Sequence, residues 1–435
     1  MSKLLKFFSA AVLLLSGAAV SALLWAQTGL EYQNPSVLIP VDLTGTFNRY
    51  NIVIPNFLPL SPGGAVADGA DRFAKRLGQN LDMTGYFQLL DPRASLESNP
   101  RAGLSPAEPM DYAPWAQIGA NFVIKGAMEA KGSNVTMELH LFDVATGTAK
   151  LGKRYAGKAA DARKMINRFA NEVILAITGE PGVFGSKIIF VNEQSVMLTE
   201  LGSDEAEKLY SGRGGNVSHP TLGRGGRTAW TRLNGRKWEL VVDGKVVYGG
   251  NLVIAPAFSP NGTIAAGYSG PSSTNIAVFD GRVPRVITNG NGIEISPTFS
   301  PDGGRMAYVS DQGGSAGIYV TSSSGGAGTR VSPGGKSTDP SWSPKGDKIT
   351  FVTRERDICV MNADGSGLRQ LTGGQGVNRH PSFSPDGRMI VFSSTRLGKS
   401  QLFVMAANGD RQQPMIPEFP GAQTLPTWSP DMPEM

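Results

Sequence analysis

The sequence predicts a small α/β domain followed by an all-β propeller of six blades that the C-terminal strand closes. Two observations predict this: a motif that recurs at spacings of 41, 43, 41 and 45 residues, and mixed helix and strand patterns ahead of it. Glycine (55 residues) and proline (29 residues) are abundant among the 435 residues, while hydrophobic residues still make up 40%. Because Gly and Pro favour turns and interrupt long helices, a coiled coil and a multi-pass membrane protein are disfavoured.

The recurring motif is a small residue and then an aromatic residue followed by Ser-Pro, in most copies with Asp-Gly or a similar turn after it. Its copies are Ala257–Gly262, Thr298–Gly303, Ser341–Gly346, Ser382–Gly387 and Thr427–Asp431. An apolar run follows each of the first four copies, and two further strand-like segments complete the period. A period in the low forties that holds four short strands is typical of propeller blades.

The residue types of the motif have architectural roles. We expect the aromatic residue to pack between neighbouring blades. The proline fixes φ near −65° and holds the preceding residue extended, which ends a strand. The Asp-Gly step supplies the positive φ of a hairpin. The repeated Ser, Asp and Gly residues are therefore not candidates for catalysis.

The blade count depends on two incomplete repeats. His219–Trp230 aligns with the repeat but has Gly-Arg in place of Ser-Pro. Lys187–Val191 aligns only with the second strand of a blade. We expect the last motif copy to supply the missing inner strand of the first blade, which removes two open sheet edges. The six expected blades are 183–217 with 425–431, 218–254, 255–295, 296–338, 339–379 and 380–424.

The part before residue 179 predicts a small α/β domain. In Asp161–Thr178 the apolar residues share one helix face, and the helix stops at Gly179. Val135–Val144 alternates apolar and polar residues, as a half-buried strand does. The other expected elements are strands at Asn51–Phe57, Phe122–Met128 and Ala149–Gly157, a helix at Ala65–Leu81 and a loop at Arg93–Pro114.

The N-terminus reads as a secretory leader. Lys3 and Lys6 precede an apolar run, and small residues follow up to Ala26. We expect cleavage after Ala26, with Ala22 as the alternative and an uncleaved anchor helix as the competing interpretation. The expected domains are thus a signal peptide at 1–26, an α/β domain at 27–178 and a propeller at 179–435. No cysteine follows the apolar run, which excludes a lipoprotein anchor, so a soluble, exported mature protein is expected.

Charge and residue counts exclude several classes of site. A net charge of +5 without any block of basic residues does not predict a nucleic-acid-binding surface. The single cysteine, Cys359, excludes an internal disulfide and a cysteine cluster. The three histidines (His140, His219 and His380) lack the spacing of zinc ligands. No metal and no cofactor are therefore expected.

Two short segments match enzyme motifs on paper. Gly313–Gly317 fits G-x-S-x-G, but it lies in an expected hairpin and not in a strand-to-helix elbow. Gly398–Ser400 resembles the end of a phosphate loop, but Ser393 stands where the first glycine is required. We expect no enzyme activity. A periplasmic propeller hydrolase or lyase is the alternative.

The order of parts resembles the TolB family of the Tol-Pal system. The resemblance covers the whole mature chain, and it is most specific at the ending Leu425–Pro430 and at the step from a helix into Gly182–Val191. It implies a non-catalytic, periplasmic binding protein that joins the inner-membrane protein TolA to the lipoprotein Pal, and we expect a monomer. It further implies roles in outer-membrane integrity and in envelope constriction during cell division, and import of colicin-type peptides.

The resemblance also implies two partner-binding regions. One is the mouth of the propeller channel, where loops before the Pro-x-φ-Ser-Pro strands surround one concavity. A rigid rim of this kind binds a partner segment at little ordering cost. The candidates there are His219, Glu294, Asp339, Arg379 and His380, with pairing among themselves or plain solvation as the alternative. The other region is the mature N-terminal segment, expected to contact TolA through Gln27, Thr28, Gly29, Leu30, Glu31 and Tyr32.

Overall fold

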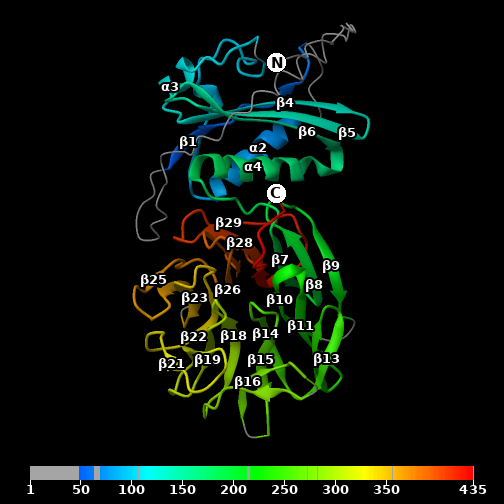
Figure 1. Ribbon diagram of the computed structural model, residues 1–435, viewed down its shortest axis with the longest axis vertical. Coiled ribbons are helices and arrows are strands. Elements are labelled where there is room, and N and C mark those ends of the chain that lie inside the picture. Colours follow the sequence, from blue (N-terminus) through cyan, green and yellow to red (C-terminus); the bar gives the residue numbers. More distant parts are fainter. Residues whose placement is uncertain are drawn as a thin grey trace, which may run out of the picture.

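The computed structural model shows an α/β unit seated on the side of a ring of β-sheets (Figure 1). It describes residues 49–62, 69–105, 107–212, 216–271, 273–281, 283–354 and 356–434. The expected leader, both cleavage sites and the N-terminal segment 27–32 lie outside these residues. Within the described part of the chain, no helix combines the length and apolar character needed to cross a membrane.

The α/β unit is built on one mixed sheet. Its strands are β1 (Tyr50–Val53), β2 (Leu58–Pro59), β3 (Phe87–Leu90), β4 (Phe122–Lys131), β5 (Asn134–Asp143) and β6 (Thr148–Lys158). The order is β3-β1-β4-β5-β6, with β2 paired to β4. β1 is parallel to β3 and β4, whereas β4, β5 and β6 are antiparallel. The strand alternation predicted at Val135–Val144 is confirmed, because β5 buries every second residue.

Two helices, α2 (Ala70–Met83) and α4 (Ala162–Thr178), cover the face of this sheet that points toward the propeller (Figure 1). Each helix turns an apolar face to a shared core that includes Leu77 and Phe169. Gly179 ends α4 with a φ of 75°, a conformation that glycine adopts without strain. The expected helix at Asp161–Thr178 is therefore confirmed to within one residue.

Other expectations for this unit need correction. The strand predicted at Asn51–Phe57 ends at Val53, because Pro55 cannot donate to a ladder. β3 was not predicted. The loop predicted at Arg93–Pro114 contains a short 3-10 turn (Pro92–Ala94), and its last two residues begin α3 (Ala113–Gln117).

The described residues after α4 form six four-stranded antiparallel sheets, as predicted. The first three, from inner to outer strand, are β30 (Gln423–Trp428), β7 (Lys187–Asn192), β8 (Ser195–Glu200), β9 (Ala206–Ser211); β10 (Val217–Leu222), β11 (Thr228–Asn234), β12 (Lys237–Val242), β13 (Lys245–Gly250); and β14 (Val253–Phe258), β15 (Ile264–Ser269), β16 (Thr274–Val278), β17 (Arg285–Val286). The others are β18 (Glu294–Phe299), β19 (Arg305–Ser310), β20 (Gly317–Ser322), β21 (Thr329–Arg330); β22 (Ser337–Trp342), β23 (Lys348–Thr353), β24 (Ile358–Asn362), β25 (Arg369–Gln370); and β26 (Asn378–Phe383), β27 (Met389–Ser394), β28 (Gln401–Ala406), β29 (Gln413–Pro414).

Closure of the ring by the C-terminal strand is confirmed. β30 is the inner strand of the sheet that continues with β7, and Trp428 lies opposite Ile188. The Trp428 side chain is 3% exposed, and its indole Nε1 donates to Ser186 Oγ at 2.7 Å. Its backbone N–H donates to Ser382 Oγ of the neighbouring blade at 3.0 Å. Trp428 therefore joins two blades as well as two strands. We call the sheet β30-β7-β8-β9 the closing blade.

The α/β unit is docked on the closing blade and on the blade β26–β29 through one continuous core and several ion pairs. The core contains Tyr86 from the α/β unit and Trp428 from the closing blade. The Arg388 guanidinium stacks over the Tyr86 ring at 5.5 Å and pairs with Glu180 at 2.8 Å.

We predict that Trp428→Ala opens the ring junction. The substitution leaves a cavity and removes the bond to Ser186, so it should lower the free energy of unfolding by about 3–5 kcal/mol. Chemical denaturation followed by tryptophan fluorescence and circular dichroism measures this. Trp238→Ala, at a half-buried position of β12, is the control and should have a clearly smaller effect. Equal losses for the two variants would contradict a special role for the closing strand.

Candidate functional site

The inner strand of every blade carries a proline preceded by a residue with positive φ. These six residues, which we call the pre-proline ring, are His219 (φ 46°), Ala255 (52°), Ser296 (55°), Asp339 (54°), His380 (53°) and Leu425 (54°). The ladder to the second strand shifts register at this point in each blade, as at a β-bulge. A bulge re-aims side chains, and a proline is tolerated there because it has no N–H to donate. The pre-proline ring therefore lines the channel.

All six inner strands run along the channel in the same direction, so equivalent strand positions lie at the same depth. They form three successive sections. Around the pre-proline ring the channel is narrow, with a cavity volume of about 140 Å³. The end lined by the aromatic-Ser-Pro residues holds about 300 Å³. The end lined by the first residues of the inner strands holds about 750 Å³. We call this wider end the mouth.

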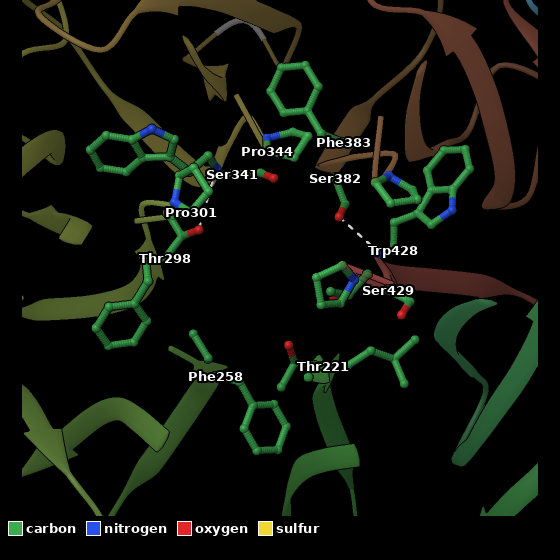
Figure 2. Close-up of a pocket in the computed structure, with 18 of the residues that line it drawn as sticks. Thr221, Phe258, Thr298, Pro301, Ser341, Pro344, Ser382, Phe383, Trp428 and Ser429 are labelled. Atoms are coloured by element: carbon green, nitrogen blue, oxygen red, sulfur yellow. Dashed lines mark hydrogen bonds between the residues drawn. The ribbon is translucent and has the colours of Figure 1, made fainter. Parts of the chain in front are cut away.

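The end of the channel lined by the aromatic-Ser-Pro residues shows what the repeated motif does (Figure 2). Figure 2 shows Phe258, Phe383 and Trp428 pointing away from the opening, between the blades. Two hydroxyl groups at the opening accept backbone N–H bonds from the next blade: Ser382 from Trp428, and Thr298 from Trp342 at 3.4 Å. The prediction that the aromatic residue packs between blades is confirmed.

The mouth brings together four of the five residues that the sequence singled out: His219, Asp339, Arg379 and His380. The imidazole rings of His219 and His380 lie 6.4 Å apart in an edge-to-face arrangement. His380 Nε2 lies 3.9 Å from Asp339 Oδ2, and His380 Nδ1 lies 3.2 Å from Ser393 Oγ. That these residues contact a partner stays a prediction.

Both histidines of the mouth are held neutral. Burial lowers the pKa of His219 to about 4, and the neighbouring His380 adds to this effect, while Asp339 opposes it. Burial also lowers the pKa of His380, again against the attraction of Asp339 and with a further lowering by Arg379. Near neutral pH the pair therefore contributes hydrogen-bonding and apolar surface, and not charge.

Glu294 is not at the mouth surface, which corrects the sequence prediction. Its side chain is fully buried and accepts a hydrogen bond from Asn275 Nδ2 of the preceding blade at 3.0 Å. Glu294 is the first residue of β18, whereas Ser296, the residue before the proline, is the one that joins the pre-proline ring. Counting back from the proline in each repeat would have avoided the error.

Sequence reasoning missed three basic residues of the mouth, Lys336, Arg354 and Arg356. Lys336 lies just before β22, and the two arginines lie in the turn between β23 and β24. With Arg379 they form four exposed cations, which we call the rim cations. The pair Arg354 and Arg356 is visible in the sequence, and its turn joins the second strand of a blade to the third, at the end where the inner strand begins.

The segments that match enzyme motifs lie in hairpins, as predicted. Gly313–Gly317 connects β19 to β20, and Gly398–Ser400 connects β27 to β28, which begins at Gln401. Cys359 is buried in β24. Among the described residues, no group of three or more His, Cys, Asp or Glu side chains is arranged to hold a metal ion.

Fold and channel together define a two-domain β-propeller protein with a candidate binding mouth at one end of its channel. Sequence models of the TolB beta propeller domain and of the TolB amino-terminal domain match residues 175–432 and 41–150. The chain belongs to the TolB family.

Individual relatives agree with this assignment. The chain is 34% identical to a Tol-Pal system protein TolB of Desulfosudis oleivorans over 75% of its length and 58% of the relative's. It is 36% identical to a TolB homolog of Chlorobium chlorochromatii over 73% and 55%, and 30% identical to one of Chlorobium luteolum over 85% and 88%. The match thus spans a little over half the length of the first two relatives. The crystal structure of TolB from Acinetobacter baumannii shares the fold, with a TM-score of 0.75 and 20% identity over 89% of this chain and 98% of that one.

We predict that His219→Gln makes the protein more resistant to acid. The unfolded chain binds a proton at His219 near the ordinary pKa of 6.5, whereas the folded chain binds it only near pH 4. Stability is therefore lost as the pH falls through this window, by about 2 kcal/mol from this one group. Urea unfolding of both proteins at pH 8 and pH 4.5 measures it. The variant should match the wild type at pH 8 and lose less at pH 4.5. A parallel loss in both proteins would contradict the assignment.

Proposed function

We propose that this chain is a non-catalytic, periplasmic scaffold of the Tol-Pal system that links TolA to the lipoprotein Pal. In this role it would support outer-membrane integrity and envelope constriction during cell division, and colicin-type peptides would use the same mouth. The observation that carries the proposal is TolB family membership over most of the chain, together with an open mouth on a rigid ring. Several relatives carry the name Tol-Pal system protein.

The proposal assigns one task to each part of the chain. Residues 1–26 would direct export, 27–178 would form the α/β domain and 179–435 the propeller of a monomer. The mouth residues His219, Asp339, Arg379 and His380 would contact the lipoprotein. The inner strands that carry these residues are paired with the second strands of their blades, so binding there immobilises little of the protein. The segment 27–32 would contact TolA.

A binding role suits the chemistry of the mouth. Neutral imidazoles, exposed guanidinium groups and the apolar side chains Ile254 and Ile295 lie around one concavity. Such a mixture of aromatic, basic and aliphatic groups is typical of surfaces that bind protein segments. Neither segment that matches an enzyme motif supplies a described residue that lines the mouth, and both lie in hairpins between propeller strands.

We expect His380→Glu to weaken the binding of the purified periplasmic domain of the cognate Pal by about tenfold. The new carboxylate would be covered by the partner and would lose its hydration without a matching partner group. Isothermal titration calorimetry measures the affinity, and a thermal melt verifies that the variant is folded. The control is Lys237→Glu, at the exposed first residue of β12, which does not line the channel. Unchanged affinity of His380→Glu would contradict the placement of Pal at the mouth.

A second prediction separates the two partner regions. Deletion of residues 27–32 from the exported chain should abolish capture of TolA and leave Pal capture unchanged, because the deletion leaves the propeller intact. Pull-down from envelope extracts with the tagged chain, followed by identification of both partners, provides the measurement. Loss of Pal together with TolA, or retention of TolA, would contradict the assignment of separate regions.

A further inference from the structure

We propose that the mouth recognises an acidic, extended segment of its protein partner, whose carboxylates pair with Lys336, Arg354, Arg356 and Arg379. The inference rests on the proposed function for the identity of the partner, and it adds the chemical class of the segment that is bound. It concerns charge, which neither the fold nor the repeat pattern determines.

The four rim cations are gathered on one side of the mouth. Lys336 precedes β22, Arg354 and Arg356 follow β23, and Arg379 is the second residue of β26. They therefore come from two neighbouring blades. The blades β14–β17 and β18–β21 contribute Ile254 and Ile295 at the position that Arg379 occupies in its own strand. The mouth thus has a cationic side and an apolar side.

The rim cations are available for a partner. All four side chains belong to exposed residues, and none forms an ion pair with a carboxylate in the described part of the chain. Some cations elsewhere on the propeller are already paired: Arg232 pairs with Glu239 at 2.6 Å, and Arg285 pairs with Asp280 at 3.1 Å. Four cations at one opening attract carboxylates over distances of about 8–10 Å at moderate salt.

The carboxylate of Asp339 does not cancel this field. It is the one acidic side chain among the described residues that line the mouth. It lies deeper, in the pre-proline ring, and its nearest basic atom is Nε2 of His380 at 3.9 Å. At the opposite end of the channel, Arg224 is the single charged side chain among the described lining residues. The concentration of positive charge is therefore specific to the mouth.

The shape of the mouth favours a peptide segment over other polyanions. A volume of about 750 Å³ that leads into a narrow channel accommodates a few residues of an extended chain. The apolar side chains of Ile254 and Ile295 provide a surface for the apolar side chains that a peptide carries next to its carboxylates. A polyphosphate or a sulfated glycan has no such side chains. A duplex nucleic acid needs a wider, open basic surface.

Two measurements on the full-length protein test the inference. Fluorescence anisotropy with a fluorescein-labelled peptide, Gly-Glu-Leu-Glu-Ser-Glu-Leu-Glu-Gly, reports binding at 0.05 M and 0.5 M salt, and the same peptide with Lys for Glu is its charge-inverted control. Titration with the periplasmic domain of Pal is carried out in parallel. The variants are the double substitution Arg354→Glu with Arg379→Glu and the control Arg236→Glu, at an exposed turn residue outside the mouth.

We expect the acidic peptide to bind and the basic one not to bind, and binding to weaken in 0.5 M salt. The double variant should lose at least about tenfold in affinity for the peptide and for Pal, and the control should bind as the wild type does. If Pal binds both variants equally, the charge inference is overturned and the proposed function stands. If the acidic peptide needs the rim but Pal does not bind at all, the proposed function fails and the charge inference stands. If a DNA oligonucleotide or heparin binds as tightly as the acidic peptide, the choice of a peptide as the bound segment is overturned.

Discussion

The ring depends on one non-covalent junction, the pairing of β30 with β7. Five blades are each formed by consecutive strands, but the closing blade joins segments more than 200 residues apart in the sequence. Without β30, β7 would present unpaired N–H and C=O groups to water and leave the core behind it open. Trp428 strengthens the junction because it fills the space between the closing blade and the blade β26–β29, and bonds to Ser186 and Ser382.

Closure fixes the backbone of the channel and leaves its side chains variable. The bulge, the positive φ and the proline recur in all six inner strands, so the pre-proline ring is set by geometry. The residues in that ring nevertheless differ: two histidines, an aspartate, a serine, an alanine and a leucine. A rigid frame with six independently variable positions can change its partner without changing its fold, which is how propellers acquire different binding properties.

The sequence predicted the number of blades and the closure because the repeated motif marks equivalent inner strands, which pack in the same way in each blade. It predicted the mouth residues His219, Asp339, Arg379 and His380 because a residue beside the inner-strand proline has a defined place. Glu294 was misplaced because the frame was set two residues too early in that repeat, where the first strand residue bonds to the preceding blade. Lys336, Arg354 and Arg356 were missed because they lie in turns, where residue types do not repeat from blade to blade. β3 was missed because Phe87–Leu90 is too short to show alternation.

The position of the α/β unit follows from the same junction. One hydrophobic core contains helix residues such as Leu77 and Phe169, closing-blade residues such as Phe190 and Trp428, and residues of β27 and β28. The unit thus packs against the two blades between which the ring would open, and the buried Arg388 connects the turn before β27 to Glu180 and Tyr86. Since β26 of the same blade carries Arg379 and His380, contacts that hold the junction closed also hold part of the mouth in place. The amino-terminal domain therefore contributes to the rigidity of the site although it supplies none of the described residues that line it.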